Sequence, residues 1–239
     1  MYKLLQGNCL KLIEKIPDDS IDLVLIDPPY AISKDSNFNK GKPKNNDCDR
    51  FRISIDFGEW DDGNSFTEDD LNFIINQLYR VLKTGGTLIC FYDLWKITTL
   101  SNILKNNKFV QLRFLEWIKT NPVPINSKIN YLTNAREIMI SAVKKKSPVF
   151  NSEYDNGIYS YPICHGKERT IHPTQKPLAL INDLILKHSN ENDMVLDCFM
   201  GSGSTGVSCL NTNRNFIGME LDEKYFSIAK ERIENVDNK

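Results

Sequence analysis

The segment MVLDCFMGSGSTG (residues 194–206) joins a short apolar run to a helix through a glycine-rich turn. Residues 194–197 are expected to form a buried strand, and residues 203–211 the helix that follows it. Gly201 and Gly203 allow the backbone to turn sharply and allow a ligand to approach it closely. The segment therefore predicts a strand–turn–helix unit with a ligand site at the turn.

A second strand, predicted over residues 216–220, ends in a carboxylate 23 residues after Asp197. An acidic side chain at that point, Glu220, can accept hydrogen bonds from ribose hydroxyls. The glycine spacing is not GxGxxG, and no lysine follows the glycines as in a phosphate-binding loop. The pattern favours an adenosine cofactor without phosphate, with a purely structural turn as the alternative.

Strands and helices alternate along the rest of the chain, which indicates a mostly parallel sheet with helices on both faces. Further strands are predicted at residues 2–5, 21–26, 87–92, 110–118 and 138–143. Further helices are predicted at residues 10–15, 67–83, 94–106, 176–188 and 223–234, with Thr67 as a helix cap. Residues 31–66 and 144–172 are expected to be irregular.

Composition favours a single domain over residues 1–239, of which 41% are hydrophobic and 26% charged. No run of about eighteen apolar residues occurs, and the N-terminus lacks the features of a secretory signal. The six cysteines form no CxxC pair, and the three histidines lack ligand spacing. We therefore expect no membrane span, no metal, and a reduced, cytoplasmic environment.

The segment Asp27-Pro28-Pro29-Tyr30 directly follows the predicted buried strand at residues 21–26. Two prolines remove two backbone donors and fix both φ angles, which holds the neighbouring carbonyls rigid. The Asp27 carboxylate and the Pro28 carbonyl could accept both N–H groups of a planar amine, and Tyr30 could stack on its ring. A turn with a packed tyrosine is the structural alternative.

The net charge is −1, so a nucleic-acid partner would need a local positive surface. Residues 34–52 carry six basic side chains against three acidic ones, and residues 144–169 carry five against three. These two segments are the candidates for such a surface, and ordinary solvated loop charge is the alternative.

Together these motifs resemble the DNA amino-methyltransferases, in the permuted group whose DPPY loop precedes the glycine-rich cofactor loop. The resemblance covers nearly the whole chain and includes IDLVLIDPPY (21–30), HPTQKPLAL (172–180) and DCFMGSGSTG (197–206). It implies a circularly permuted, doubly wound, mostly parallel sheet of seven strands, Rossmann-like, with a short irregular recognition insertion. Strand 194–197 would then lie beside strand 21–26, so that cofactor and target meet at the carboxyl ends of both.

The resemblance also implies which residues act. Catalysis is expected to fall on Asp27, Pro28, Pro29 and Tyr30. The cofactor, S-adenosylmethionine, is expected to be bound by Asn8, Cys9, Asp27, Thr174, Lys176, Asp197, Phe199, Gly201, Ser202, Gly203, Ser204, Thr205, Glu220 and Leu221.

Individual positions carry their own expectations. Lys176 could pair with the carboxylate of the cofactor, and Thr174 could cap the helix that follows it. Asn8 stands where the family commonly has Asp, at the end of the strand facing the cofactor's adenine. Cys198 stands where Pro is common.

The implied reaction is direct methyl transfer to the N6 amine of an adenine flipped out of double-stranded DNA. Carbon-5 methylation of cytosine would need a positioned cysteine, and no Pro-Cys pair occurs near a catalytic loop. The alternatives are N4 methylation of cytosine, methylation of RNA or a protein amide, and an inactive DNA-binding module. Asp27, where those other families tend to have Ser or Asn, favours adenine.

DNA contact is expected at a catalytic loop, residues 31–66, and at a target-recognition insertion, residues 145–172. A second copy of the chain and a cognate restriction endonuclease are the further partners that the resemblance suggests.

Overall fold

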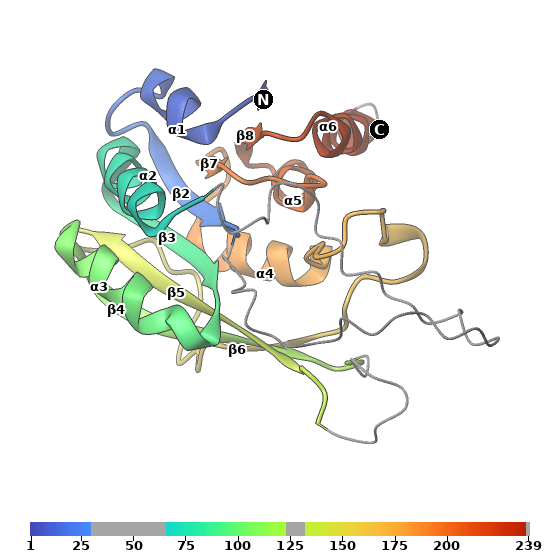
Figure 1. Ribbon diagram of the computed structural model, residues 1–239, viewed down its shortest axis with the longest axis horizontal. Helices are drawn as coiled ribbons and strands as arrows, with labels where there is room; N and C mark the ends of the chain where they lie inside the picture. The colour runs from blue at the N-terminus through green and yellow to red at the C-terminus, as the bar shows by residue number, and fades with distance from the viewer. Residues whose placement is uncertain (30–65, 123–131, 238–239) are drawn as a thin grey trace, which may run out of the picture.

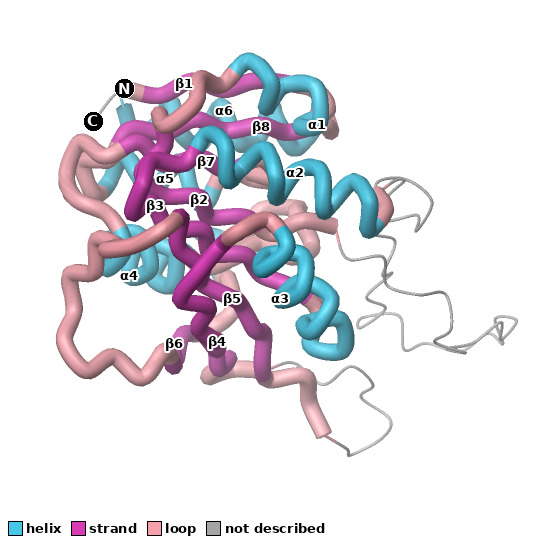
Figure 2. The backbone as a smooth tube through the Cα atoms, turned by 90° about the vertical axis from the view of Figure 1, so that its left-hand side faces the viewer, coloured by secondary structure: helices cyan, strands magenta, loops and turns pink. Residues whose placement is uncertain are grey.

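The computed structural model describes residues 1–29, 66–122 and 132–237 (Figure 1). Tyr30 and nearly all of the predicted loop 31–66 lie outside the described residues. The described part is a single sheet with helices on both sides, as Figure 2 shows. None of its helices has the length and apolar character needed to cross a membrane.

Eight strands form the sheet in the order β1-β8-β7-β2-β3-β5-β4-β6. The strands are β1 (Tyr2–Gln6), β2 (Ile21–Ile26), β3 (Leu82–Tyr92), β4 (Phe109–Lys119), β5 (Arg136–Lys144), β6 (Ile158–Tyr161), β7 (Met194–Asp197) and β8 (Asn215–Glu220). The α-helices are α1 (Cys9–Leu12), α2 (Glu68–Val81), α3 (Ile97–Asn106), α4 (Leu178–His188), α5 (Ser204–Asn211) and α6 (Glu223–Asp237). Short 3-10 helices are η1 (Ile13–Lys15), η4 (Leu94–Lys96) and η5 (Gly166–Glu168).

Most strand pairs are parallel, and only β5 pairs antiparallel with its neighbours β3 and β4. This confirms the predicted doubly wound, Rossmann-like α/β class. Strand β2 pairs with β7, with Val24 opposite Leu196. The expected juxtaposition of these two segments, far apart in the sequence, is therefore confirmed.

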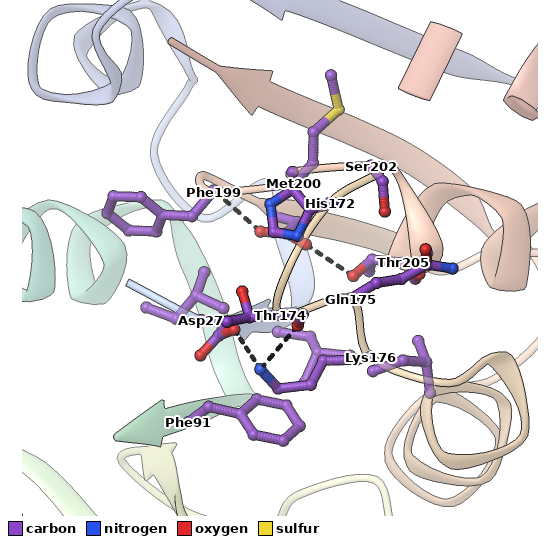
Figure 3. Close-up of a pocket in the computed structure, with 16 residues that line it drawn as sticks. Asp27, Phe91, His172, Thr174, Gln175, Lys176, Phe199, Met200, Ser202 and Thr205 are labelled. Carbon is purple, nitrogen blue, oxygen red and sulfur yellow. Dashed lines mark hydrogen bonds and ion pairs between the residues drawn. The ribbon is translucent and has the colours of Figure 1, made fainter. Parts of the chain in front are cut away.

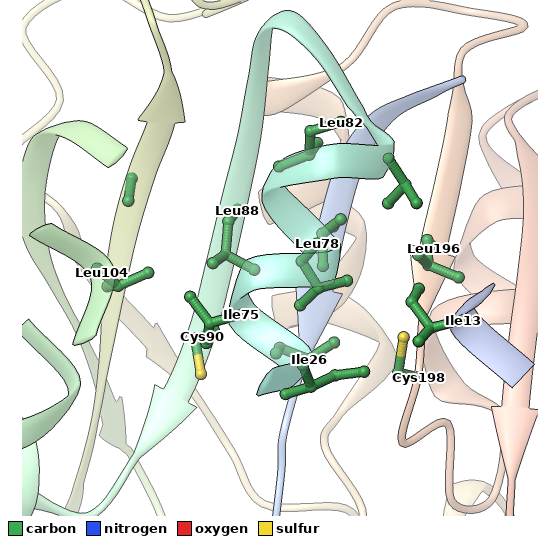
Figure 4. Packing of buried hydrophobic residues seen from close by; sticks show 14 of the residues in the cluster. Ile13, Ile26, Ile75, Leu78, Leu82, Leu88, Cys90, Leu104, Leu196 and Cys198 are labelled. Carbon is green, nitrogen blue, oxygen red and sulfur yellow. The ribbon is translucent and has the colours of Figure 1, made fainter. Parts of the chain in front are cut away.

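Both faces of the sheet are buried because side chains of each strand alternate between two cores. In β2, Val24 and Ile26 pack with α1, α2 and α3, whereas Leu23 and Leu25 pack with α4, α5 and α6. Figure 4 shows the first core, where Ile26 meets the α2 side chains Ile75 and Leu78. A central strand of such a sheet has to be apolar on both sides. The burial of β2 in both cores fixes the position of Asp27, the next residue, at the carboxyl end of the strands.

The sheet has one strand more than the seven expected. Strand β6 lies inside the segment predicted to be irregular, and it pairs in parallel with the end of β4. Tyr159 is buried, and the Trp117 indole Nε1 donates to the Tyr161 carbonyl at 2.9 Å. A single buried aromatic in a four-residue strand gives too weak an alternation for a sequence-based prediction.

Helix α2 begins as predicted and ends early. Thr67 and Asp70 form a capping box at its start. The predicted end near Lys83 is wrong, because the helix stops at Val81 and β3 follows at once. The Lys144 Nζ donates to the Arg80 and Leu82 carbonyls at 3.2 and 2.7 Å, so a side chain from β5 satisfies the carbonyls where the helix ends.

Candidate active site

Several predicted site residues meet where β2 and β7 end. Asp27 directly follows β2, Asp197 closes β7, and the two strands are hydrogen-bonded neighbours. A pocket of about 400 Å³, counted with the open space at its mouth, lies over this edge (Figure 3). Predicted site residues that line it are Asp27, Thr174, Lys176, Asp197, Phe199, Gly201, Ser202, Ser204 and Thr205.

Other predicted residues lie outside this lining: Asn8, Cys9, Pro28, Pro29, Gly203, Glu220 and Leu221. Asn8 caps α1, accepting from the Leu10 N–H at 2.8 Å. Its backbone neighbour Gly7 donates to the Glu220 carbonyl at 2.8 Å, so Asn8 lies at the same sheet edge, two strands from β7. Leu221 is exposed.

The glycine-rich turn is fixed by a set of internal hydrogen bonds. The Gly201 N–H donates to Glu220 Oε2 at 2.8 Å, which ties the turn to the end of β8. Gly201 and Gly203 have φ of +50° and +82°, a region that favours glycine. A Cβ on Gly203 would lie 2.9 Å from the Ala229 Cβ of α6, so this glycine also permits the helix to pack closely.

Asp197 is a buried carboxylate at the base of the turn. Its Oδ1 accepts from the Phe199 N–H at 2.9 Å, and its Oδ2 accepts from the Thr205 hydroxyl at 2.7 Å. Burial raises the pKa of Asp197 to about 7, against the effect of these two hydrogen bonds, and the nearby Asp27 and Glu220 add to the rise. Burial also raises the pKa of Glu220.

Lys176 lies directly against Asp27. Its Nζ donates to Asp27 Oδ2 and, at 3.4 Å, to the Thr174 carbonyl (Figure 3). The same atom approaches Glu137 Oε2 at 3.3 Å. It also lies 4.9 Å from the centre of the Phe91 ring. Burial lowers the pKa of Lys176, but the Asp27 and Glu137 carboxylates outweigh it, so the pKa is raised overall. Lys176 is therefore a buried, fully protonated cation.

The expectation that Thr174 caps α4 is wrong. The helix starts at Leu178, and its N-cap position is Pro177. Glu168 Oε1 accepts from the Leu178 N–H at 2.6 Å instead. Thr174 lies instead in a turn that lines the pocket before the helix begins.

Sequence reasoning missed three residues at this site. His172 lines the pocket, packs against Tyr225 with the ring centres 4.4 Å apart and the rings tilted by 59°, and lies over Gly201. Burial lowers the pKa of His172 to about 4, aided by Lys176, so it is neutral at neutral pH. Glu137 reaches Lys176 from β5. His172 could have been found, because it is the first residue of the motif HPTQKPLAL. No sequence signal indicated that Glu137 lies at this site.

Gln175, the third residue missed, holds the backbone before Lys176 in place. Its Oε1 accepts from the Thr170 N–H at 2.8 Å, and its Nε2 donates to the Glu168 carbonyl at 2.8 Å. These bonds close residues 168–175 into a compact loop. The loop carries Lys176 to Asp27.

The basic residues of the predicted insertion do not form one surface. Lys144 is buried against α2, so its expected place in a positive surface is wrong. Strand β5 runs antiparallel to β3, which puts residues 144–146 at the other end of the strands, about 20 Å or more from the end of β3. Lys167 and Arg169 are exposed and lie near the loop that carries Lys176. Of these basic residues, only Lys167 and Arg169 lie at the same end of the strands as the pocket.

No three histidine, cysteine or acidic side chains are grouped as metal ligands within residues 1–29, 66–122 and 132–237. The five cysteines in these ranges are all buried. Burial raises the pKa of Cys9 and of Cys164 to about 12, which makes both poor nucleophiles.

The fold and the pocket define a Rossmann-like α/β protein with a ligand site at the carboxyl edge of its sheet. A family model described as DNA methylase, for N6 and N4 methylation, matches residues 21–231. The Type II methyltransferase M.HinfI of Haemophilus influenzae is 33% identical over 253 residues, covering 98% of this chain and 68% of that protein. M2.LlaDCHI of Lactococcus lactis subsp. cremoris is 34% identical over 246 residues, covering 96% and 88%.

Solved structures agree with this result. The M1.HpyAVI–SAM complex superposes with a TM-score of 0.72 at 30% identity, covering 98% of this chain and 99% of that one. The cytosine-N4-specific PvuII DNA methyltransferase has a TM-score of 0.74 at 16% identity, covering 99% and 92%, which shows a shared fold. The chain belongs to the DNA methylase family.

Proposed function

We propose that this protein transfers a methyl group from S-adenosylmethionine to the N6 amine of adenine in double-stranded DNA. The observation that carries the proposal is the shared pocket of Asp27 and the glycine-rich turn, because transfer requires donor and amine within reach of each other. Membership of the DNA methylase family supports the reaction class. The order of the two motifs along the chain supports the permuted group within it.

The charges of the pocket suit this cofactor. Asp27, Asp197 and the adjacent Glu220 are acidic, and the buried cation Lys176 is already paired with carboxylates. A site of this kind disfavours phosphate and favours a ligand that carries positive charge, as a sulfonium does. The cofactor supplies an electrophilic methyl group when bound. The proposed binding set consists of the predicted site residues that line the pocket, together with Asn8, Cys9, Gly203, Glu220 and Leu221.

In the proposed mechanism Asp27 and the Pro28 carbonyl accept the two N–H groups of the target amine. A carboxylate offers about four acceptor positions, so Asp27 can accept from an amine while it is paired with Lys176. Fixing both N–H groups turns the nitrogen lone pair toward the methyl donor, and positioning supplies much of the rate. Tyr30, outside the described residues, is proposed to stack on the flipped base.

Adenine is favoured over cytosine by Asp27 itself, through the family tendency for Asp at the first DPPY position. N4 methylation of cytosine uses the same geometry and is the competing reaction. The five cysteines in the described part of the chain are buried, which disfavours carbon-5 chemistry by any of them because that reaction needs a reactive thiolate.

DNA contact is proposed for residues 31–66 and for the part of the insertion near the pocket, where Lys167 and Arg169 are exposed. Lysine and arginine contacts to phosphate would make binding weaker as salt rises. We also propose that residues 1–239 form a single domain. The further proposed partners are a second copy of the chain, in a homodimer, and a cognate restriction endonuclease.

The test compares Asp27→Asn with Asp22→Asn. Asp22 lies near the start of β2 and Asp27 directly follows its end; both pair with a lysine, and their side chains are 19% and 24% exposed. With tritiated S-adenosylmethionine and DNA, we expect Asp27→Asn to lose at least about 100-fold in kcat, a much larger effect than the loss in its cofactor affinity. Asp22→Asn is expected to retain activity. Asp27→Asn with the activity of Asp22→Asn would remove Asp27 from the mechanism.

A further inference from the structure

Four charged side chains from four segments form a continuous row that ends at Asp27. Lys119 of β4 approaches Glu137 Oε1 at 2.8 Å, Glu137 Oε2 approaches Lys176 Nζ at 3.3 Å, and Lys176 donates to Asp27. The signs alternate along the row, so each charge faces the opposite one. Asp27, at its end, is the member of the row that contacts the target amine in the proposed reaction.

The ammonium of Lys176 has three N–H donors, and three oxygen atoms surround it. These belong to the Asp27 carboxylate, the Glu137 carboxylate and the Thr174 carbonyl. An ammonium held by three acceptors has a restricted orientation, and the Lys176 side chain is only 9% exposed. The orientation of the Lys176 ammonium toward Asp27 therefore depends on the position of the Glu137 carboxylate.

We propose that Glu137 is a positioning residue: it holds the Lys176 ammonium against Asp27 and thereby fixes the orientation of the Asp27 carboxylate toward the target amine. The inference rests on the proposed function. It also gives β5 a part in the site, since β5 brings Glu137 to the edge where β2 ends.

Electrostatics supports this role. Glu137 has a pKa that burial raises and that Lys176 and Lys119 lower more strongly, so it is ionised. If Glu137 lost its charge, no carboxylate would separate the ammonium groups of Lys119 and Lys176. Asp27 would then be the carboxylate that remains paired with Lys176. Titratable groups around Lys176 on the neighbouring elements are Asp27, Lys119, Glu137, Cys164 and His172. Of these, Glu137 and Asp27 are the two that favour the protonated Lys176.

The experiment uses Glu137→Gln, which keeps the shape and removes the charge. Glu116→Gln is the matched control, since Glu116 lies on the adjacent strand β4, pairs with Arg136 at 3.2 Å, and is 28% exposed against 29% for Glu137. We expect kcat of Glu137→Gln to fall about 10- to 100-fold, with KM for DNA and cofactor within about twofold. Its activity should also decline at a lower alkaline pH than that of the wild type.

A second measurement needs no activity. In the full chain with ¹⁵N-labelled lysine, the Lys176 ammonium signal is followed by NMR as pH rises. Glu137→Gln is expected to lower the Lys176 pKa by about 1 to 3, and Glu116→Gln to leave it unchanged. Glu137→Asp keeps the charge and should recover most of the Lys176 pKa and part of the kcat.

An unchanged Lys176 pKa in Glu137→Gln would overturn the inference, as would a kcat equal to that of the control. No recovery in Glu137→Asp would also overturn it. A wild-type protein that transfers no methyl group to DNA would count against the proposed function, whereas an active wild type with an unaffected Glu137→Gln would count against this inference alone.

Discussion

Replacing Asp197 by Asn should make the protein more stable at alkaline pH. Asp197 is 5% exposed, and its pKa is raised from 3.8 to about 7 in the folded state. A carboxyl with a raised folded pKa contributes stability below its unfolded pKa and loses it as pH rises through the folded pKa. Each pH unit in that window is worth about 1.4 kcal/mol, so between pH 5 and 8 Asp197 alone should lower the free energy of unfolding by about 2–3 kcal/mol.

Asparagine has the same shape and cannot ionise. Its oxygen can still accept from the Phe199 N–H, and the Thr205 hydroxyl can rotate to accept from its amide. The measurement is urea unfolding of both proteins at pH 5 and pH 8 without ligand, with Asp193→Asn, at the other end of β7, as the control. The stability of wild type relative to Asp197→Asn should fall by about 2–3 kcal/mol over this range, and the control should follow the wild type. An equal pH dependence of wild type and Asp197→Asn would refute the raised pKa.

Two stability predictions concern the turn and the end of α2. Gly203→Ala should cost about 1–3 kcal/mol, because φ is +82° and the new Cβ would crowd Ala229; in urea unfolding, a loss below about 0.5 kcal/mol would contradict this. Lys144→Met should cost about 1–3 kcal/mol, because the Arg80 and Leu82 carbonyls lose their donor, and thermal unfolding with no change in Tm would contradict that.

The central part of the fold could be predicted because its signals are local. The apolar run of β2 ends at Asp27, and the glycine-rich turn follows β7. Each of these two structures can therefore be predicted from the residues of its own segment. The pairing of β2 with β7 followed from the resemblance, since 167 residues separate Asp27 from the start of β7 at Met194. Periodicity alone could not have placed them side by side.

What the sequence missed depends on partners that only the folded chain brings together. Helix α2 ends where Lys144 reaches its carbonyls, and α4 begins where Glu168 meets the Leu178 N–H. Nothing in the sequence indicated that Lys176 lies between Asp27 and Glu137. Pairing with the cofactor stays a prediction, and it would require Lys176 to exchange one of its three acceptors.

The identity of the methylated base tests the central claim most directly. Purified protein would be incubated with S-adenosylmethionine and unmethylated DNA, and the DNA then digested to nucleosides and analysed by mass spectrometry. The account predicts N6-methyladenine in the wild-type reaction and none with Asp27→Asn. N4-methylcytosine, or a DNA without any new methyl group, would contradict it.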